Sequence, residues 1–452
     1  MGAGPAGIFA ALELTRAGVD GVLLLEKGPD LSERQRLGRA GSMLAGWGGA
    51  GAYSDGKLAL STEIGGFMDQ YCTPHQLAEL VDYVDETYRA FGAPAELHGS
   101  DAEAVGRLQR QAARLDMKLI PSRYRHLGTE GCGDLVGKLR AHLGAHVAIR
   151  CGAPVAQVIV GTGNRARGVR LEDGTEIVAD SVILAPGREG SAWLAQEAKR
   201  LNLRTTINPV DIGVRVEVPA SVLEEITRAT YEAKIIYYTR RFEDMVRTFC
   251  MCPHGEVIRE DLGGLYTVNG HSYAHGATGN TNFALLVSKT FTEPFHEPIA
   301  YGRYIAQLAN MLGGEVLVQR VGDLRQGRRS TPGRLARGLV EPTLKGATPG
   351  DLSLVLPYRY LADILEMLEA LDRLAPGVNS VHTLLYGVEV KFYSLQLRLS
   401  RALETEVSGL YAVGDGAGVS RGLVQASASG VLAARAIAAR LTGGTPPPRA
   451  AQ

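Results

Sequence analysis

The sequence predicts an α/β protein with a second, α+β domain, and three observations support this prediction. A glycine-rich turn at 2–7 leads into a helix through Arg16, and the apolar run Val22–Leu25 follows as a buried strand. A similar strand, turn and small-residue helix close the chain at 410–441. Between these ends, residues 206–397 have longer strands and one strongly amphipathic helix. The two ends therefore belong to one sheet, and the middle forms another domain.

Shorter segments complete the first sheet. In chain order, we expect a region of helical periodicity, then one further helix, and then several strands separated by turns of Gly, Asn and Asp. The helical region is 62–130, the helix is 134–143, and the strands are 147–151, 155–160, 166–171 and 176–185.

The opening β-α-β unit lacks its first strand in this sequence. Gly2 follows Met1 directly, whereas such a turn is normally preceded by about five residues of buried parallel strand. Because that strand is central in the sheet, its absence leaves two neighbours with unpaired backbone groups. We expect a start codon assigned too late, or a trimmed fragment.

The composition excludes several classes of protein. The 452 residues carry a formal net charge of zero, which gives no electrostatic bias toward nucleic acid. No apolar run reaches the roughly 18 residues that a membrane span needs. The cysteines are odd in number and scattered, which is not a disulfide framework. We expect a cytoplasmic protein that binds a small-molecule substrate and no nucleic acid.

The opening turn has the glycine spacing of a dinucleotide-binding loop. Gly2 allows the tight turn, Gly4 lets the backbone approach a pyrophosphate, and Gly7 allows close helix packing. Glu26 follows at the end of the next strand, where a carboxylate can accept hydrogen bonds from an adenosine ribose. The alternative is a glycine-rich turn that binds nothing, with Glu26 simply solvated.

Three further glycine motifs suit the same ligand. The run 46–57 is rich in glycine, which suits a backbone passing close to a planar ring or a phosphate, although a flexible surface loop is the alternative. Ala185-Pro186-Gly187 ends a strand with small residues. In Gly414-Asp415-Gly416 the carboxylate can accept a ribityl hydroxyl, while the helix from Leu423 directs N–H groups at the electron-rich edge of a reduced flavin.

Together these motifs resemble FAD-dependent oxidoreductases of the glutathione-reductase-like superfamily. The resemblance rests on the order and spacing of the motifs at 2–7, 26, 48–57, 185–187 and 411–418, and is greatest to a largely uncharacterised bacterial group of FAD-dependent dehydrogenases. Segments of the second domain, at 211–215, 248–253, 270–272 and 281–285, also look like that group. The absent first strand is the departure from the pattern.

The resemblance implies a domain organisation and a set of FAD-binding residues. The Rossmann-like FAD-binding domain is expected at 1–61, 131–205 and 398–442, with a helical insertion at 62–130, a substrate domain at 206–397 and a disordered tail at 443–452. The implied FAD-binding residues are Gly2, Gly4, Pro5, Ala6, Gly7, Glu26, Lys27, Gly48, Gly49, Ser54, Asp55, Gly56, Val155, Ala185, Gly187, Gly414, Asp415 and Leu423. The flavin would exchange a hydride at N5.

Candidates for proton exchange with the flavin are Ser54, Lys57 and His271, in that order. For His271 and the nearby His275, the alternative to proton exchange is that each is a hydrogen-bonded histidine in a loop. Cys250 and Cys252 share a strand face and are expected to pack in the core, since a metal site needs further ligands; no metal is expected. Five arginines are crowded in one stretch: Arg325, Arg328, Arg329, Arg334 and Arg337. We expect them either to bind an anionic substrate or a nicotinamide phosphate, or to form a solvated basic surface.

No second glycine fingerprint accompanies the first, so a separate nicotinamide domain is not expected, and NAD(P)H is a candidate only as a transient electron donor. Three alternatives stay open: a truncated flavin-free remnant or binding module, a flavin-dependent RNA-modifying enzyme, and a lipid reductase of the geranylgeranyl type. The neutral net charge argues against the second.

Overall fold

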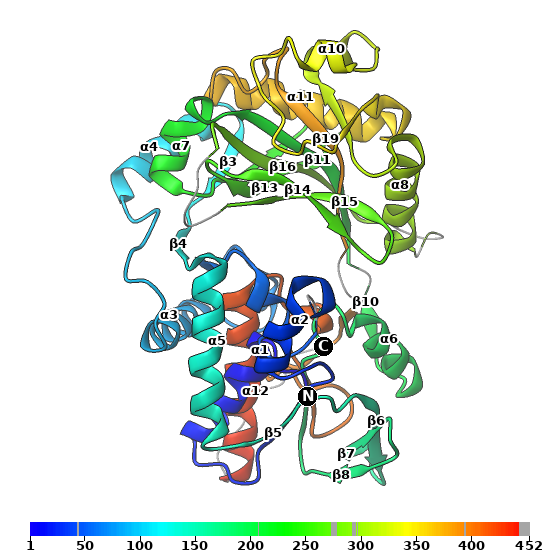
Figure 1. Ribbon diagram of the computed structural model, residues 1–452. Coiled ribbons are helices and arrows are strands. Elements are labelled where there is room, and N and C mark those ends of the chain that lie inside the picture. Colours follow the sequence, from blue (N-terminus) through cyan, green and yellow to red (C-terminus); the bar gives the residue numbers. More distant parts are fainter. Residues whose placement is uncertain are drawn as a thin grey trace. The chain divides into compact units, whose positions relative to one another are not determined.

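The computed structural model describes residues 1–42, 45–206, 208–272, 278–291, 295, 297–392 and 395–442, and these divide into two units. Unit 1 comprises 1–96, 125–208 and the described part of 393–452; unit 2 comprises 97–124 and 209–392. Parallel strands with helices in unit 1 and a large sheet with helices in unit 2 confirm the predicted α/β fold class (Figure 1).

Unit 1 holds two pairs of parallel strands, β1 with β5 and β9 with β21, and a three-stranded antiparallel sheet of β6, β7 and β8. In chain order its elements are α1 (Pro5–Arg16), β1 (Leu23–Leu25), α2 (Leu31–Ser42), η1 (Gly49–Tyr53), β2 (Lys57–Leu60), η2 (Met68–Gln70), α3 (Pro74–Ala90), α5 (Gly128–Gly144), β5 (Ala148–Arg150), β6 (Val155–Gly161), β7 (Arg165–Leu171), β8 (Glu176–Val178), β9 (Val182–Leu184), α6 (Ser191–Arg200), β10 (Thr205–Thr206), β20 (Gln396–Leu397), β21 (Leu410–Ala412), η4 (Asp415–Ala417) and α12 (Leu423–Leu441).

The first two residues lie between the two parallel pairs. The Met1 amine donates to the Ile183 carbonyl at 3.0 Å, and the Ala185 N–H donates to the Met1 carbonyl at 2.8 Å. On the other side, the Gly2 N–H donates to the Leu25 carbonyl at 2.6 Å. The two neighbours that the sequence predicts to be unpaired are thus bonded, in part, by the residues that lead into the glycine turn.

Helices α1 and α12, which lie near opposite ends of the chain, pack closely in unit 1 because small residues face each other. A Cβ on Gly430 would stand 2.0 Å from the Ala6 carbonyl oxygen. Helix α3 completes this layer: the Tyr88 hydroxyl is 2.9 Å from Ser427 Oγ, and the rings of Phe9 and Tyr88 are 4.8 Å apart. This packing brings the N-terminal glycine turn beside the turn that precedes α12.

Unit 2 is built on an eight-stranded sheet in the order β18-β17-β19-β11-β16-β13-β12-β3, with the hairpin β14–β15 beside it. Figure 1 shows helices α7 and α11 on one face of this sheet. Its elements are α4 (Ala102–Ala113), β3 (Met117–Ile120), β11 (Val210–Pro219), α7 (Ala220–Thr230), β12 (Lys234–Tyr238), β13 (Met245–Cys252), β14 (Glu256–Asp261), β15 (Tyr266–His271), β16 (Asn280–Lys289), α8 (Pro298–Gly313), β17 (Leu317–Arg320), α9 (Val321–Arg325), α10 (Pro332–Leu335), β18 (Thr348–Pro349), η3 (Leu352–Leu354), α11 (Tyr358–Leu374) and β19 (Leu384–Lys391); β4 (Arg123–His126) spans the boundary at 124.

Both faces of the central strand β11 are buried. Val214 and Val216 point into the main apolar core with the helices, and the alternate residues Asp211, Arg215 and Glu217 are equally buried on the other face. That second face is therefore a layer of charged side chains closed off from water.

The domain boundaries differ from those predicted. The expected helical insertion 62–130 is not a separate body, because α3 packs against α12 in unit 1 while β3 adds a strand to the sheet of unit 2 by pairing with β12. The predicted strand 176–185 is two strands, β8 and β9, which belong to different sheets. The predicted tail 443–452 lies outside the described residues. None of the helices in the described ranges is long and apolar enough to cross a membrane.

Candidate functional site

The N-terminal glycine turn leaves the start of α1 open. Gly2 has φ +95°, and a Cβ there would stand 2.0 Å from the Ala185 carbonyl oxygen; a Cβ on Gly7 would stand 1.9 Å from that of Gly2. Gly4 is the N-cap of α1 and offers no side-chain hydrogen bond, and the first turn contains no acidic residue. The partial positive charge of this helix end is therefore available to an anion.

A second glycine loop lies directly against the first. The Gly48 N–H donates to the Ala3 carbonyl at 2.8 Å, and a Cβ on Gly49 would stand 2.9 Å from Gly4 Cα. The two backbones can approach this closely because position 49 is glycine, where any Cβ would overlap Gly4. Ser54 ends the loop, and its hydroxyl donates to the Gly51 carbonyl at 2.8 Å.

Glu26 is buried at the end of β1 and holds the two loops in place. One carboxylate oxygen accepts from the Ala3 N–H at 2.7 Å, and the other accepts from the N–H groups of Gly28 and Gly46, each at 2.9 Å. The carboxylate therefore holds the backbone of the two glycine loops in position through these hydrogen bonds. The ribose role that the sequence suggests would use the acceptor capacity that remains.

Asp415 follows β21 and faces the N-terminal turn from the other end of the chain. Its carboxylate accepts a hydrogen bond from the Ser420 hydroxyl at 2.6 Å. Burial raises the pKa of Asp415, an effect that the positive charges of Arg188 and Arg421 and the Ser420 hydrogen bond oppose. The next helix, α12, begins after Gly422, which provides no side-chain cap.

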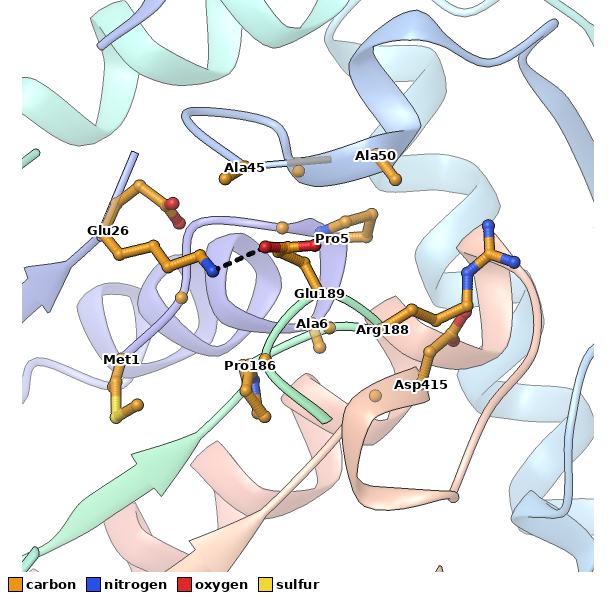
Figure 2. Close-up of a pocket in the computed structure, with 18 of the residues that line it drawn as sticks. Met1, Pro5, Ala6, Glu26, Ala45, Ala50, Pro186, Arg188, Glu189 and Asp415 are labelled. Carbon is orange, nitrogen blue, oxygen red and sulfur yellow. Dashed lines mark hydrogen bonds and ion pairs between the residues drawn. The ribbon is translucent and has the colours of Figure 1, made fainter. Parts of the chain in front are cut away.

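These loops enclose one cavity of about 410 Å³ whose described lining residues all belong to unit 1. Figure 2 shows Glu26, Pro5 and Asp415 in succession along it. The predicted FAD-binding residues that line it are Gly2, Gly4, Pro5, Ala6, Glu26, Lys27, Gly49, Ser54, Val155, Ala185, Gly187, Gly414, Asp415 and Leu423. The motifs at 2–7 and 414–415 thus meet in a single wall.

Five predicted site residues of unit 1 do not line this cavity. Gly7 packs under the turn and Gly48 packs against Val136. A Cβ on Gly56 would overlap Cys132. The Lys57 ammonium pairs with Asp55 at 3.1 Å, and its side chain is only 8% exposed. Both side chains of this pair are directed into the protein, so we find no contact of Lys57 with the cavity.

Sequence reasoning missed several residues of the cavity wall. They are Glu172, Arg188, Glu189, Trp193 and Arg421. Arg188 and Glu189 directly follow the recognised turn 185–187, so their position was a usable signal. No pattern in the sequence points to Glu172 or Trp193, which reach the cavity through the packing of β7 and α6.

The candidates in unit 2 have structural partners. His271 is buried at the end of β15, and His275 lies outside the described residues. Cys252 is buried, and its sulfur lies 3.3 Å from the Arg215 guanidinium.

The arginine-rich stretch is mostly tied to the protein itself. Arg328 and Arg334 pair with the buried Asp323, and Arg325 pairs with Glu369. Arg337 donates to the backbone of Gly333. Within the described ranges, no group of three or more His, Cys, Asp and Glu side chains is placed to hold a metal ion.

Two family models match parts of this chain. Residues 209–392 match the family described as FAD-dependent protein, C-terminal domain-like, and these bounds coincide with the larger segment of unit 2. Residues 349–445 match the family of glucose inhibited division protein A. This confirms the predicted resemblance to FAD-dependent proteins, and with it FAD as the cofactor.

Three individual proteins are also similar to this chain, at identities of 28% and below. An uncharacterized protein of Clostridium beijerinckii (strain ATCC 51743 / NCIMB 8052) is 28% identical over 471 residues, covering 97% of this chain and 80% of that protein. The 3-ketosteroid-Δ4-(5α)-dehydrogenase of Rhodococcus jostii RHA1 aligns with TM-score 0.44 at 14% identity, covering 97% and 95%. Quinol fumarate reductase FrdA of E. coli aligns with TM-score 0.42 at 13% identity, covering 99% and 70%.

Proposed function

We propose, from the match of residues 209–392 to FAD-dependent proteins, that the chain is an FAD-dependent oxidoreductase whose cofactor is held by the cavity of unit 1. The observation that carries this proposal is that Gly4 and Asp415 line one cavity although they are far apart in sequence. A single elongated dinucleotide is the ligand that these two motifs fit.

We propose that the parts of the dinucleotide lie in succession along the cavity. The open N-terminus of α1 at Gly4 fits the pyrophosphate, and Glu26 lies at the adenosine end. The Asp415 carboxylate accepts one hydrogen bond from the described residues, so it retains acceptor capacity for a ribityl hydroxyl.

FAD, when bound, supplies the redox centre, with hydride exchange at its N5. Of the three candidates for proton exchange, Ser54 alone lines the cavity. Its hydroxyl donates to the Gly51 carbonyl and accepts from the Gly56 N–H at 3.2 Å, which fixes its orientation. NAD(P)H is proposed as a transient donor, and the substrate as a small molecule.

The test is the flavin content of the purified protein, followed by anaerobic reduction with NADH and with NADPH and reoxidation by a panel of acceptors. We expect a yellow protein whose flavin is reduced by a nicotinamide or by the substrate. A protein that stays colourless after incubation with FAD would contradict the proposal and favour the flavin-free remnant.

The variant Gly4→Val tests the proposed position of the pyrophosphate. Gly4 has an extended backbone conformation that any residue can adopt, and a Cβ there has its nearest neighbour at 3.9 Å. The valine side chain should therefore project into the cavity, where it would occupy the space of the ligand, and the protein should still fold. We expect a folded, colourless variant, and normal FAD binding by this variant would argue against the proposed pyrophosphate position.

The RNA-modifying flavoenzyme is the second candidate, because residues 349–445 match glucose inhibited division protein A. It predicts salt-sensitive binding of RNA by the FAD-loaded protein. Absence of such binding at low salt would remove it.

A further inference from the structure

An ion pair crosses the cavity of unit 1. The Lys27 ammonium lies 3.1 Å from a Glu189 carboxylate oxygen, and both residues line the cavity. Lys27 directly follows Glu26 at the end of β1, whereas Glu189 belongs to the loop between β9 and α6. Figure 2 draws the pair as a dashed line at Glu189, with Glu26 to one side of it and Pro5 to the other.

The backbone on the Glu189 side of the pair is held firmly. The Gly190 N–H donates to the Pro186 carbonyl at 3.1 Å, and a Cβ on Gly190 would stand 2.5 Å from the Pro186 side chain. The same loop packs on Gly416, whose Cβ would stand 2.4 Å from the Gly187 carbonyl oxygen. Opening of the ion pair is therefore a matter of side-chain rotation rather than of loop movement.

We infer that Lys27 and Glu189 form a clasp over the adenosine half of the cavity, which opens to admit or release an adenine dinucleotide and closes over it. This inference rests on the proposed function, because Glu26 marks the adenosine end only if FAD binds there. The clasp regulates the rate of cofactor exchange and needs no contact between Lys27 and the cofactor.

The exposure of the pair sets the size and the salt dependence of the effect. The two side chains are 43% and 42% exposed, and pairs this accessible typically change an equilibrium constant by less than about fivefold. Raising the salt from about 0.1 M to about 1 M shortens the screening length from about 10 Å to about 3 Å. The clasp should therefore loosen in high salt.

The experiment measures the dissociation rate of FAD from the loaded protein, followed by recovery of flavin fluorescence on dilution. Lys27→Gln and Glu189→Gln should each release FAD about two- to fivefold faster. The double variant should be no faster than either single one. The exchanged pair, Lys27→Glu with Glu189→Lys, should restore the slow rate.

Salt and a control pair sharpen the result. Release from the unaltered protein should accelerate in about 1 M salt and reach the rate of the single variants, which should themselves change little. Arg170→Gln breaks a pair of similar exposure, 42% and 51%, that does not line the cavity, and it should leave the release rate unchanged.

Two results would overturn the clasp. Additive effects of the two single variants would mean that each side chain acts separately. An effect of Lys27→Gln without one of Glu189→Gln would mean that Lys27 binds the cofactor directly. Either result leaves the proposed function standing, whereas failure of the unaltered protein to hold FAD would remove the proposed function and the clasp together.

Discussion

The two units use glycine to make room for different occupants. In unit 1, the nearest neighbour of a Cβ on Gly4 among the described residues would be Gly49, at 3.9 Å, and the space beyond it is the cavity. In unit 2, a Cβ on Gly270 would stand 1.8 Å from a nitrogen of Arg215, so the protein's own guanidinium fills that space. Gly4 thus lies beside room for a ligand, and Gly270 beside none.

Carboxylates in the two units show the same difference. Glu217 in unit 2 accepts hydrogen bonds from Asn280, Tyr386 and both the hydroxyl and the N–H of Thr343. The Asp415 carboxylate in unit 1 accepts one from the described residues, donated by Ser420. A carboxylate with few protein donors beside a cavity is typical of a binding site, whereas a buried, fully bonded carboxylate is part of the core.

The largest effect on stability is expected from removing the buried Arg215 guanidinium of unit 2. Arg215 donates to Asn282 at 2.8 Å, pairs with Glu389 at 3.4 Å and is fully buried. Arg215→Met should lower the free energy of unfolding by about 3–5 kcal/mol, because it leaves buried polar partners uncompensated. Urea denaturation measures this loss. A loss no greater than that of the exposed Arg170→Gln would contradict the comparison.

The next effect concerns pH and the Asp363 carboxyl of unit 2. Asp363 is fully buried and accepts a hydrogen bond from Thr239 at 2.8 Å. Burial, and then the neighbouring Asp244, raise the pKa of Asp363 to about 6. The native state therefore binds more protons than the unfolded state between about pH 4 and 6, so this group's contribution to stability falls as pH rises through that range.

Asp363→Asn removes this titration. The variant should be more stable than the unaltered protein above pH 6, by up to about 3 kcal/mol, and the two should converge at acid pH. Thermal unfolding across the pH range measures this. Equal stabilities at pH 7 would show that the Asp363 carboxylate is already compensated, like that of Glu217.

A smaller effect is expected at the open site of unit 1. Asp415→Asn retains an acceptor for Ser420 but removes the charge, and it should weaken FAD binding by about 10- to 100-fold, since hydrogen bonds to charged groups contribute about 1.5–3 kcal/mol. Without FAD the variant should be at least as stable as the unaltered protein near neutral pH, because burial raises the pKa of Asp415. Calorimetric titration and urea denaturation measure the two quantities. A variant that is destabilised without FAD would place Asp415 among the core carboxylates.

Local patterns predicted much of the fold. Helix α12 occupies the predicted residues Leu423–Leu441, and β1 ends at Leu25, immediately before Glu26 as expected. These features follow from periodicity and turn chemistry, which the sequence contains. The run 176–185 was harder, because its strand-forming residues continue through a change of sheet that only tertiary packing decides.

The candidate site was predictable where backbone dictates it, and less so where side chains choose among partners. Glycine at positions 2, 7 and 49 follows from close approach, because a Cβ at each would overlap a neighbouring atom. The Lys57 ammonium could point either to the cavity or to Asp55, and the nearby carboxylate decides for Asp55. Glu26 is similar, since three backbone N–H groups bind its carboxylate, and nothing in the sequence order announces them.

Hydrogen exchange of the backbone amides, with and without FAD, tests most directly whether both ends of the chain hold one cofactor. Stoichiometric FAD should slow exchange in two peptides together, one covering the turn at 2–8 and one covering 413–426. Protection of only one of these peptides, or of neither while FAD is bound, would contradict the account.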